Sequence, residues 1–226
     1  MYGYLLHTLL HFLAGACISY LTLVKSDDLR RKQLILLAVG GVVALLPDIT
    51  KFFGDILGHS IFAAPFFGWL AAWLYRKYDK TIPYKKLWLI FTFIVIIGHL
   101  FIDYIGNGLA LFFPFVRSEF DFHIIPSIDF FSLTILLIMF PLTFYFKKGK
   151  AIFITGLATI DLYLIILSVS KVQLEHELHQ EYEGIELLET YPSSSDFGEW
   201  NFLLKTNVEW IRGSSPILGG GHSIEK

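Results

Sequence analysis

The chain has one cysteine, Cys17, among its 226 residues. A single cysteine excludes an intramolecular disulfide and any redox chemistry that needs a pair of thiols. Charged residues are scarce, at 17% of the chain, and the formal net charge of −2 gives no basic excess that would favour binding to nucleic acid. The first residues contain no Lys or Arg and no cleavage site, so we expect Met1 to Val24 to be a retained helix and not a signal peptide.

Apolar residues, in contrast, are abundant. They make up 54% of the chain, 17% of the residues are aromatic, and the mean hydropathy is +0.58. This composition is typical of a polytopic membrane protein. The apolar segments cover residues 4–24, 33–47, 58–75, 87–113, 128–146 and 151–170. We therefore expect an all-α membrane protein whose residues 1–171 form a bundle of about six transmembrane helices.

Residues 172–226 are more polar and predict a short tail outside the membrane. A short helix is expected up to Glu183, followed by strands between Glu199 and Ile211 with a turn at Lys205 to Asn207, which together predict a small β-hairpin. The glycine-rich end from Gly219 is expected to be disordered.

Basic residues are distributed unevenly among the predicted loops. Those after the first, third and fifth segments hold 12 Lys and Arg residues, and the other two hold only Lys51 and Arg117. Cytoplasmic loops carry the excess of basic residues. This asymmetry predicts that both termini lie outside the cytoplasm. We expect the protein itself to lie in the inner membrane of a prokaryotic cell.

Several polar residues fall within or beside the apolar segments. His99 and Asp103 are four residues apart and thus project from one face of a helix. With this orientation they lie about 18 and 24 Å across a hydrocarbon core of about 30 Å, in its outer half. The outer layer is also expected to contain the other candidate ligands, namely His11, Asp48 and His59. His7 is one turn from His11 and is the alternative to it, and Asp129 lies at a similar level, where it would orient a histidine ligand.

Imidazole and carboxylate groups are the ligands of a divalent metal ion, with zinc expected first and manganese or iron as alternatives. Three histidines and two aspartates suit one metal ion with an open position, or two metal ions that share a carboxylate. A metal-bound hydroxide could attack a phosphoryl or acyl centre, with Asp48 or Asp103 as the base. No H-E-x-x-H motif is present.

The motifs around these residues resemble those of the YdjM-like membrane-bound metal-dependent hydrolases. The family pattern has an early histidine in the first helix, an L-P-D-[IL]-D box, an R-G-x-T-H-S box and an H-x-x-x-D motif followed by glycine and then P-F. Here the matching segments are Leu46 to Ile49, Gly58 to Ser60, His99 to Asp103 and Phe113 to Phe115. The resemblance implies metal ligands at His11, Asp48, His59, His99 and Asp103.

The chain departs from this pattern at two boxes. Thr50 replaces the second aspartate of the L-P-D box, and the arginine and threonine before His59 are missing. Asp55 is a candidate replacement for the missing acid.

These observations favour an integral membrane metal-dependent hydrolase that acts from the outer leaflet on a lipid-like phosphoester or ester. The bilayer and such a substrate are its expected partners. One alternative is a transporter or proton-coupled carrier that uses the same residues as a relay. A structural membrane protein with a vestigial site and a haem protein with histidine ligands are the others.

Overall fold

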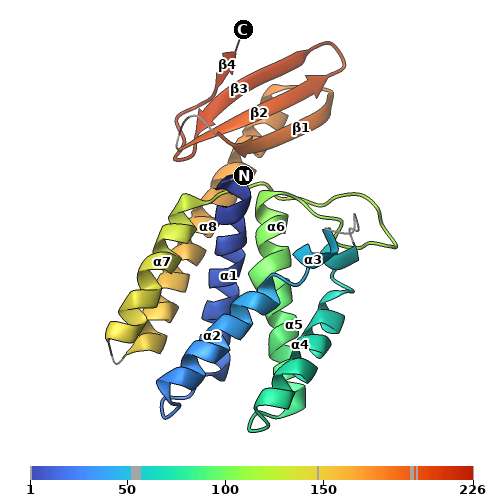
Figure 1. The fold of residues 1–226 in the computed structure, drawn as a ribbon. Coiled ribbons are helices and arrows are strands. Elements are labelled where there is room, and N and C mark those ends of the chain that lie inside the picture. The colour runs from blue at the N-terminus through green and yellow to red at the C-terminus, as the bar shows by residue number, and fades with distance from the viewer. Residues whose placement is uncertain (1, 52–56, 147, 194–195, 197, 226) are drawn as a thin grey trace.

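The computed structural model describes residues 2–51, 57–146, 148–193, 196 and 198–225. It contains a bundle of helices with a small β-sheet at one end, on the side where the N-terminus also lies (Figure 1). The helices of the bundle are α1 (Tyr2–Leu23), α2 (Arg30–Ala44), α3 (Asp48–Lys51), η1 (Leu57–His59), α4 (Ala64–Tyr78), α5 (Tyr84–Val95), η2 (Ile96–Leu100), α6 (Phe101–Gly106), α7 (Phe130–Tyr145) and α8 (Gly149–Glu181).

Three helical stretches of the described chain are long and apolar enough to cross a membrane. They are Gly3–Leu23, Tyr84–Gly106 and Gly149–Glu181. α2 and α4 have 15 residues each and α7 has 16, fewer than the roughly 20 that span a bilayer without tilt or distortion. The predicted helical bundle is thus confirmed, with three candidate membrane spans among the described residues, whereas six transmembrane helices are not confirmed.

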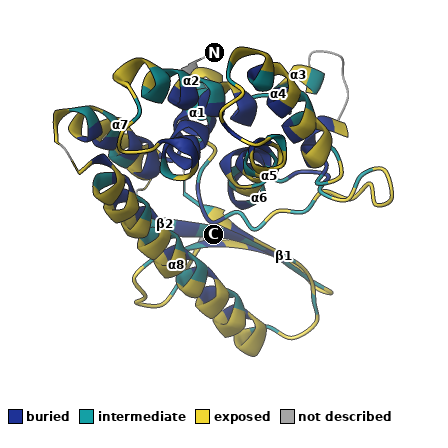
Figure 2. Cartoon of the chain, turned by 90° about the horizontal axis from the view of Figure 1, so that it is seen from below, coloured by how far each residue is buried: buried dark blue, intermediate teal, exposed yellow. Residues whose placement is uncertain are grey.

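The helices pack around α1, most of whose residues are buried or half-buried (Figure 2). α2 packs against one side of α1, α4 pairs with α5, and α7 pairs with α8. Half of the Gly3–Leu23 window is buried but only 22% of the window in α8 is, so α8 exposes most of its apolar surface. This arrangement places α1 where side chains from several helices can meet it.

The helix formed by the fourth apolar segment is shorter than the sequence predicts. Its helix ends at Gly106, and residues up to Asp129 are largely irregular, although the apolar run extends to residue 113. Gly108 has a φ of +75°, a conformation that favours glycine and ends the helix. The chain after it turns back, with Leu109 paired to Phe120 in an isolated bridge.

A π-helical turn, η2, interrupts the helix between α5 and α6. Such turns contain an additional residue and often occur at functional sites. η2 includes His99, and Asp103 follows in the first turn of α6.

The C-terminal tail is a four-stranded antiparallel sheet in the order β1 (Ile185–Pro192), β2 (Glu199–Thr206), β3 (Trp210–Pro216) and β4 (Ser223–Glu225). It is larger than the predicted hairpin, because β1 pairs with β2 over the segment Leu187 to Pro192 and β4 pairs with β3. The end that sequence predicts to be disordered therefore includes a strand.

The sheet packs against the C-terminal half of α8. Trp200, Phe202 and Leu204 of β2 are buried in one cluster with Leu174 and Leu178 of the helix. α8 runs without a break across residue 171, the predicted domain boundary, so the predicted short helix is its continuation. The tail is thus attached to a helix of the bundle itself.

Candidate metal centre

Six ionisable side chains meet at the end of the bundle nearest the sheet. They come from α1 (His7 and His11), α3 (Asp48), η1 (His59), η2 (His99) and α6 (Asp103). Figure 1 shows these ends of α1, α3 and α6 on the same side of the molecule. His11 and His99 are fully buried, and Asp103 and His59 expose only 2% and 5% of their surface. Burial of so many ionisable groups together requires compensation of their charge.

The first group of candidate ligands is His7, His11 and Asp103. Oδ1 of Asp103 lies 3.0 Å from Nε2 of His7 and 3.3 Å from Nε2 of His11. The two Nε2 atoms are 2.8 Å apart. Because His7 and His11 are one turn apart on α1, their rings project from the same face of the helix.

Backbone carbonyls determine the tautomers of these two histidines. Nδ1 of His7 lies 2.8 Å from the carbonyl oxygen of Ser127, and Nδ1 of His11 lies 3.1 Å from that of Gly98. A carbonyl oxygen only accepts hydrogen bonds, so each Nδ1 is the donor and each neutral ring presents a lone pair at Nε2. Two lone pairs and a carboxylate oxygen therefore face one another, as they do around a metal ion whose histidine ligands are oriented by carbonyls.

The second group is Asp48, His59 and His99. Oδ1 of Asp48 lies 3.4 Å from Nε2 of His59 and 3.8 Å from Nε2 of His99. The two Nε2 atoms are 3.1 Å apart. This group repeats the chemistry of the first, with two imidazoles and one carboxylate.

Asp103 links the two groups through its separate oxygen atoms. Oδ1 faces the histidines of α1, whereas Oδ2 lies 3.4 Å from Nε2 of His99 and 3.6 Å from Nε2 of His59. A carboxylate that presents one oxygen to each of two ligand groups can bridge two metal ions. The donor set, four imidazoles and two carboxylates, fits zinc and other first-row divalent metals.

Asp48 lies at the more exposed side of the cluster, in α3 beyond the end of α2. Its Oδ1 also lies 2.9 Å from Nζ of Lys51. Burial alone raises the pKa of the Asp48 carboxyl. The opposite effect of His59, His99 and Lys51 is larger, so that the pKa is well below its usual value. Asp48 is thus ionised and available to a cation.

The five residues that sequence selected as ligands all belong to this cluster, and the structure adds His7. Sequence reasoning treated His7 and His11 as alternatives, although their spacing of four residues already placed both rings on one face of the helix. The spacing of His99 and Asp103 also brings them together, with 3.4 Å between Nε2 and Oδ2.

Asp129 does not orient a histidine, contrary to the sequence-based expectation. Its carboxylate accepts hydrogen bonds from the backbone N–H groups of Phe131 and Ser132 and from the hydroxyl of Tyr163. It is therefore the N-cap of α7. The carbonyls of Ser127 and Gly98 have the orienting role instead.

The departure at Thr50 has a structural counterpart. The Thr50 hydroxyl donates to the Pro47 carbonyl, 2.9 Å away, and belongs to neither ligand group. A Cβ on Gly58 would lie 2.1 Å from that hydroxyl, so α3 and η1 pack closely at this point. Asp55, the candidate replacement acid, lies outside the described residues.

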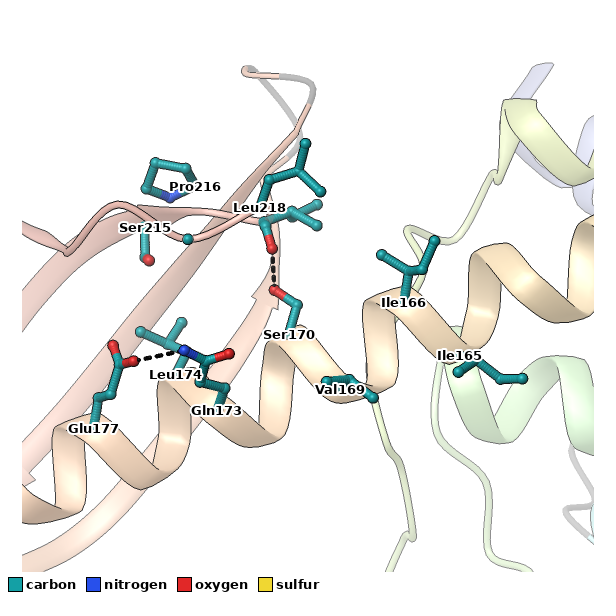
Figure 3. Close-up of a pocket in the computed structure, with 12 residues that line it drawn as sticks. Ile165, Ile166, Val169, Ser170, Gln173, Leu174, Glu177, Ser215, Pro216 and Leu218 are labelled. Atoms are coloured by element: carbon teal, nitrogen blue, oxygen red, sulfur yellow. Dashed lines mark hydrogen bonds between the residues drawn. The ribbon is translucent and has the colours of Figure 1, made fainter.

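A different hollow, of about 320 Å³, lies between α8 and the end of β3 (Figure 3). The acid at its edge, Glu177, accepts a hydrogen bond from Gln173, and Ser170 donates one to the carbonyl of Ile217. These polar groups are paired with one another, so this hollow lacks the converging lone pairs of the His–Asp cluster.

A family model described as YdjM inner membrane protein matches residues 6–174, which include all six side chains of the cluster. Neither the curated proteins nor the solved structures contain a match to the chain.

Proposed function

Because the chain belongs to the YdjM family of inner membrane proteins, we propose that this integral membrane protein is a metal-dependent hydrolase of a lipid-like phosphoester or ester. The observation that carries the proposal is the division of the Asp103 carboxylate between two histidine groups. Unless a metal ion or a proton lies between them, the facing lone pairs of His7 and His11, whose Nε2 atoms are 2.8 Å apart, would repel each other in a buried site.

In the proposed centre, His7 and His11 would hold one divalent metal ion, His59, His99 and Asp48 would hold a second, and Asp103 would contribute an oxygen to each group. Zinc is the first candidate, with manganese or iron as alternatives. The bound metal supplies a water molecule with a lowered pKa and polarises the phosphoryl or acyl oxygen.

Among the two aspartates, Asp48 is the better candidate for the general base. Both oxygens of Asp103 face histidines, whereas Asp48 contacts His59, His99 and Lys51 through Oδ1. We assign Oδ2 of Asp48 to accept the proton of the attacking water. Asp103 is then a metal ligand and not the catalytic base, a role that the sequence also allows for it.

The proposed site faces the outer leaflet. The helix ends that carry the basic clusters, such as Lys25 to Lys32 and Arg76 to Lys86, lie at the end of the bundle opposite the sheet (Figure 1). If those loops are cytoplasmic, as their charge predicts, then the cluster, the sheet and both termini are extracytoplasmic.

The test is elemental analysis of detergent-purified protein, with the parent compared with a His99→Ala/Asp103→Ala variant. We expect about two zinc, manganese or iron ions per chain in the parent, one for each ligand group, and their loss in the variant. A matched control, His176→Ala/Asp27→Ala, removes one histidine and one exposed aspartate elsewhere and should keep the metal. A single Asp103→Asn variant, which preserves the side-chain shape, tests the site if the double variant does not fold.

Absence of metal from the folded parent would contradict the hydrolase proposal. The relay of a proton-coupled carrier, or a structural role, would then account for the same residues. If metal is present, hydrolysis of lipid phosphoesters and carboxylic esters is measured next, and failure to cleave either class would leave a metal site without the proposed reaction.

A further inference from the structure

A cleft of about 1030 Å³ begins at the His–Asp cluster and opens at the side of the bundle. It lies between the start of α1, the α2–α3 junction and the segment before α7, with Tyr4, Leu45 and Ile128 in its walls. His7 and Asp48 are among the residues that line it. Since each belongs to a different ligand group, the cleft reaches the centre between the two groups.

The walls of the cleft are apolar on the side that faces away from the cluster. Tyr4 is 84% exposed and Ile49 is 49% exposed, so apolar surface continues from the cleft to the outside of the bundle. Tyr4 begins the predicted membrane segment 4–24, so we expect this surface to lie at the level of the outer leaflet. A long apolar chain could thus enter from the bilayer without leaving an apolar environment.

The part of the cleft beside the cluster is polar, and among its described lining residues Lys51 is basic, with a side chain that is 55% exposed. Its Nζ lies 2.9 Å from Oδ1 of Asp48, and Nδ2 of Asn107 lies 3.1 Å from Nε2 of His7. Two hydrogen-bond donors therefore flank the cluster, one beside each ligand group, and a metal ion on Nε2 of His7 would release the Asn107 N–H that points to that nitrogen. Arg117, the other basic residue of the predicted outer loops, is not among the lining residues.

We propose that the cleft binds a phosphate monoester of a long apolar alcohol, with the chain between Tyr4 and Ile49 and the phosphate beside Lys51. This inference rests on the proposed function, because it identifies which of the two ester classes the centre takes. Lys51 and Asn107 would donate to the phosphoryl oxygens, which are strong acceptors.

The charge of the centre favours this class over a neutral ester. Two divalent metal ions held with Asp48 and Asp103 would leave two positive charges, and Lys51 would add a third. A phosphate monoester near neutral pH carries between one and two negative charges. A carboxylic ester carries none and would leave that positive charge uncompensated at the edge of a low-dielectric region.

The test measures lipid retained by the purified full-length protein after gel filtration in detergent. Three probes separate the sources of affinity: dioleoyl phosphatidic acid has the phosphate and the chains, glycerol 3-phosphate has only the phosphate, and dioleoylglycerol has only the chains. We expect phosphatidic acid to bind at least about ten-fold more tightly than either of the other two.

Lys51→Gln should weaken the binding of phosphatidic acid by about ten-fold, and Lys51→Arg should restore it. Ile49→Trp, which fills the cleft, should weaken phosphatidic acid binding and leave glycerol 3-phosphate unaffected. Arg117→Gln is the matched charge control and should bind like the parent. Equal binding by the Lys51→Gln and Arg117→Gln variants, or of dioleoylglycerol and phosphatidic acid, would overturn the proposal.

Metal content measured on the same samples separates this inference from the proposed function. A protein that holds metal and cleaves a neutral lipid ester, but shows no preference for phosphate, would contradict the phosphate site alone. A protein without metal that still binds phosphatidic acid through Lys51 would support the phosphate site and contradict the proposed metal-dependent hydrolase function.

Discussion

Gly15 of α1 and Gly40 of α2 bring their backbones into direct contact, since a Cβ on Gly15 would lie 2.5 Å from the Gly40 carbonyl oxygen. Close helix approach through small residues is a common means of packing in membranes. The Gly98 backbone lies against Gly15 as well, where an added Cβ would be 3.3 Å from the Gly15 nitrogen. Three helical segments are thereby held close to His11, whose Nδ1 donates to the Gly98 carbonyl.

Gly15→Ala should separate these helices, because the methyl group would clash with backbone atoms that cannot rotate away. We expect a destabilisation of about 1–3 kcal/mol and lower metal content. The thermal unfolding midpoint in detergent and elemental analysis measure the two effects. Gly106→Ala is a suitable control, since its Cβ would find only an ordinary contact of 3.4 Å with Ile125. Equal midpoints for the two variants would argue against the close contact.

Asp48→Asn and Asp103→Asn should differ in their effect on metal stoichiometry. Asp48 belongs to one ligand group and Asp103 faces both, so we expect two metal ions per parent chain, one for Asp48→Asn and fewer than one for Asp103→Asn. An amide keeps the shape of the side chain but lacks the charge that binds a cation. Elemental analysis gives the ratios, and one metal per parent chain would contradict the bridged pair.

Trp200→Ala should detach the sheet from α8 and leave the metal centre intact. Trp200 is fully buried, and its indole N–H donates to the Ser170 hydroxyl 2.8 Å away. Its loss should destabilise the sheet by about 3–5 kcal/mol. Limited proteolysis should then release the tail while metal content stays at the parental value. Trp210→Ala, at a position 56% exposed, is the control and should resist proteolysis like the parent.

Labelling of single cysteines can test the orientation, because Cys17 is buried and should react little in the folded protein. Glu209 lies in the sheet region and Lys80 follows α4, and both are exposed. A membrane-impermeant maleimide added to intact cells should label Glu209→Cys and not Lys80→Cys. The reverse pattern would place the cluster on the cytoplasmic side and contradict the outer-leaflet proposal.

The sequence predicts the bundle well because long apolar runs have few alternatives in a protein of this composition. Where the fourth run ends was less predictable, since Leu109 to Phe113 are as apolar as a helix but follow Gly108 in a left-handed conformation. Hydropathy is not sensitive to that backbone angle. The sequence also does not predict that β1 pairs with β2, because the alternation of apolar and polar residues along one strand does not identify the strand that pairs with it.

Five of the six residues of the candidate cluster can be selected from the sequence, but their division into two groups cannot. Depth and motif spacing selected His11, Asp48, His59, His99 and Asp103, but neither can indicate that the two oxygens of Asp103 face different histidines. Side-chain torsion decides that relationship. Asp129 was misassigned because an aspartate before an apolar helix has the same sequence signature whether it caps the helix or supports a metal ligand.

The π-helical turn η2 makes the position of Asp103 depend on a count of residues. Each residue in an α-helix advances the chain by about 100°, so the inserted residue determines which direction α6 faces. Deleting Ile96 or Ile97 would restore a regular helix and rotate Asp103 by about a quarter turn or slightly more relative to α5. Every amino acid of the cluster would remain in the chain, yet the bridge between its two halves would point elsewhere. An alignment of the family that compares only residue identities would therefore miss the loss of the π-helical turn. An alignment that also counts the residues between Tyr84 and His99 would detect it.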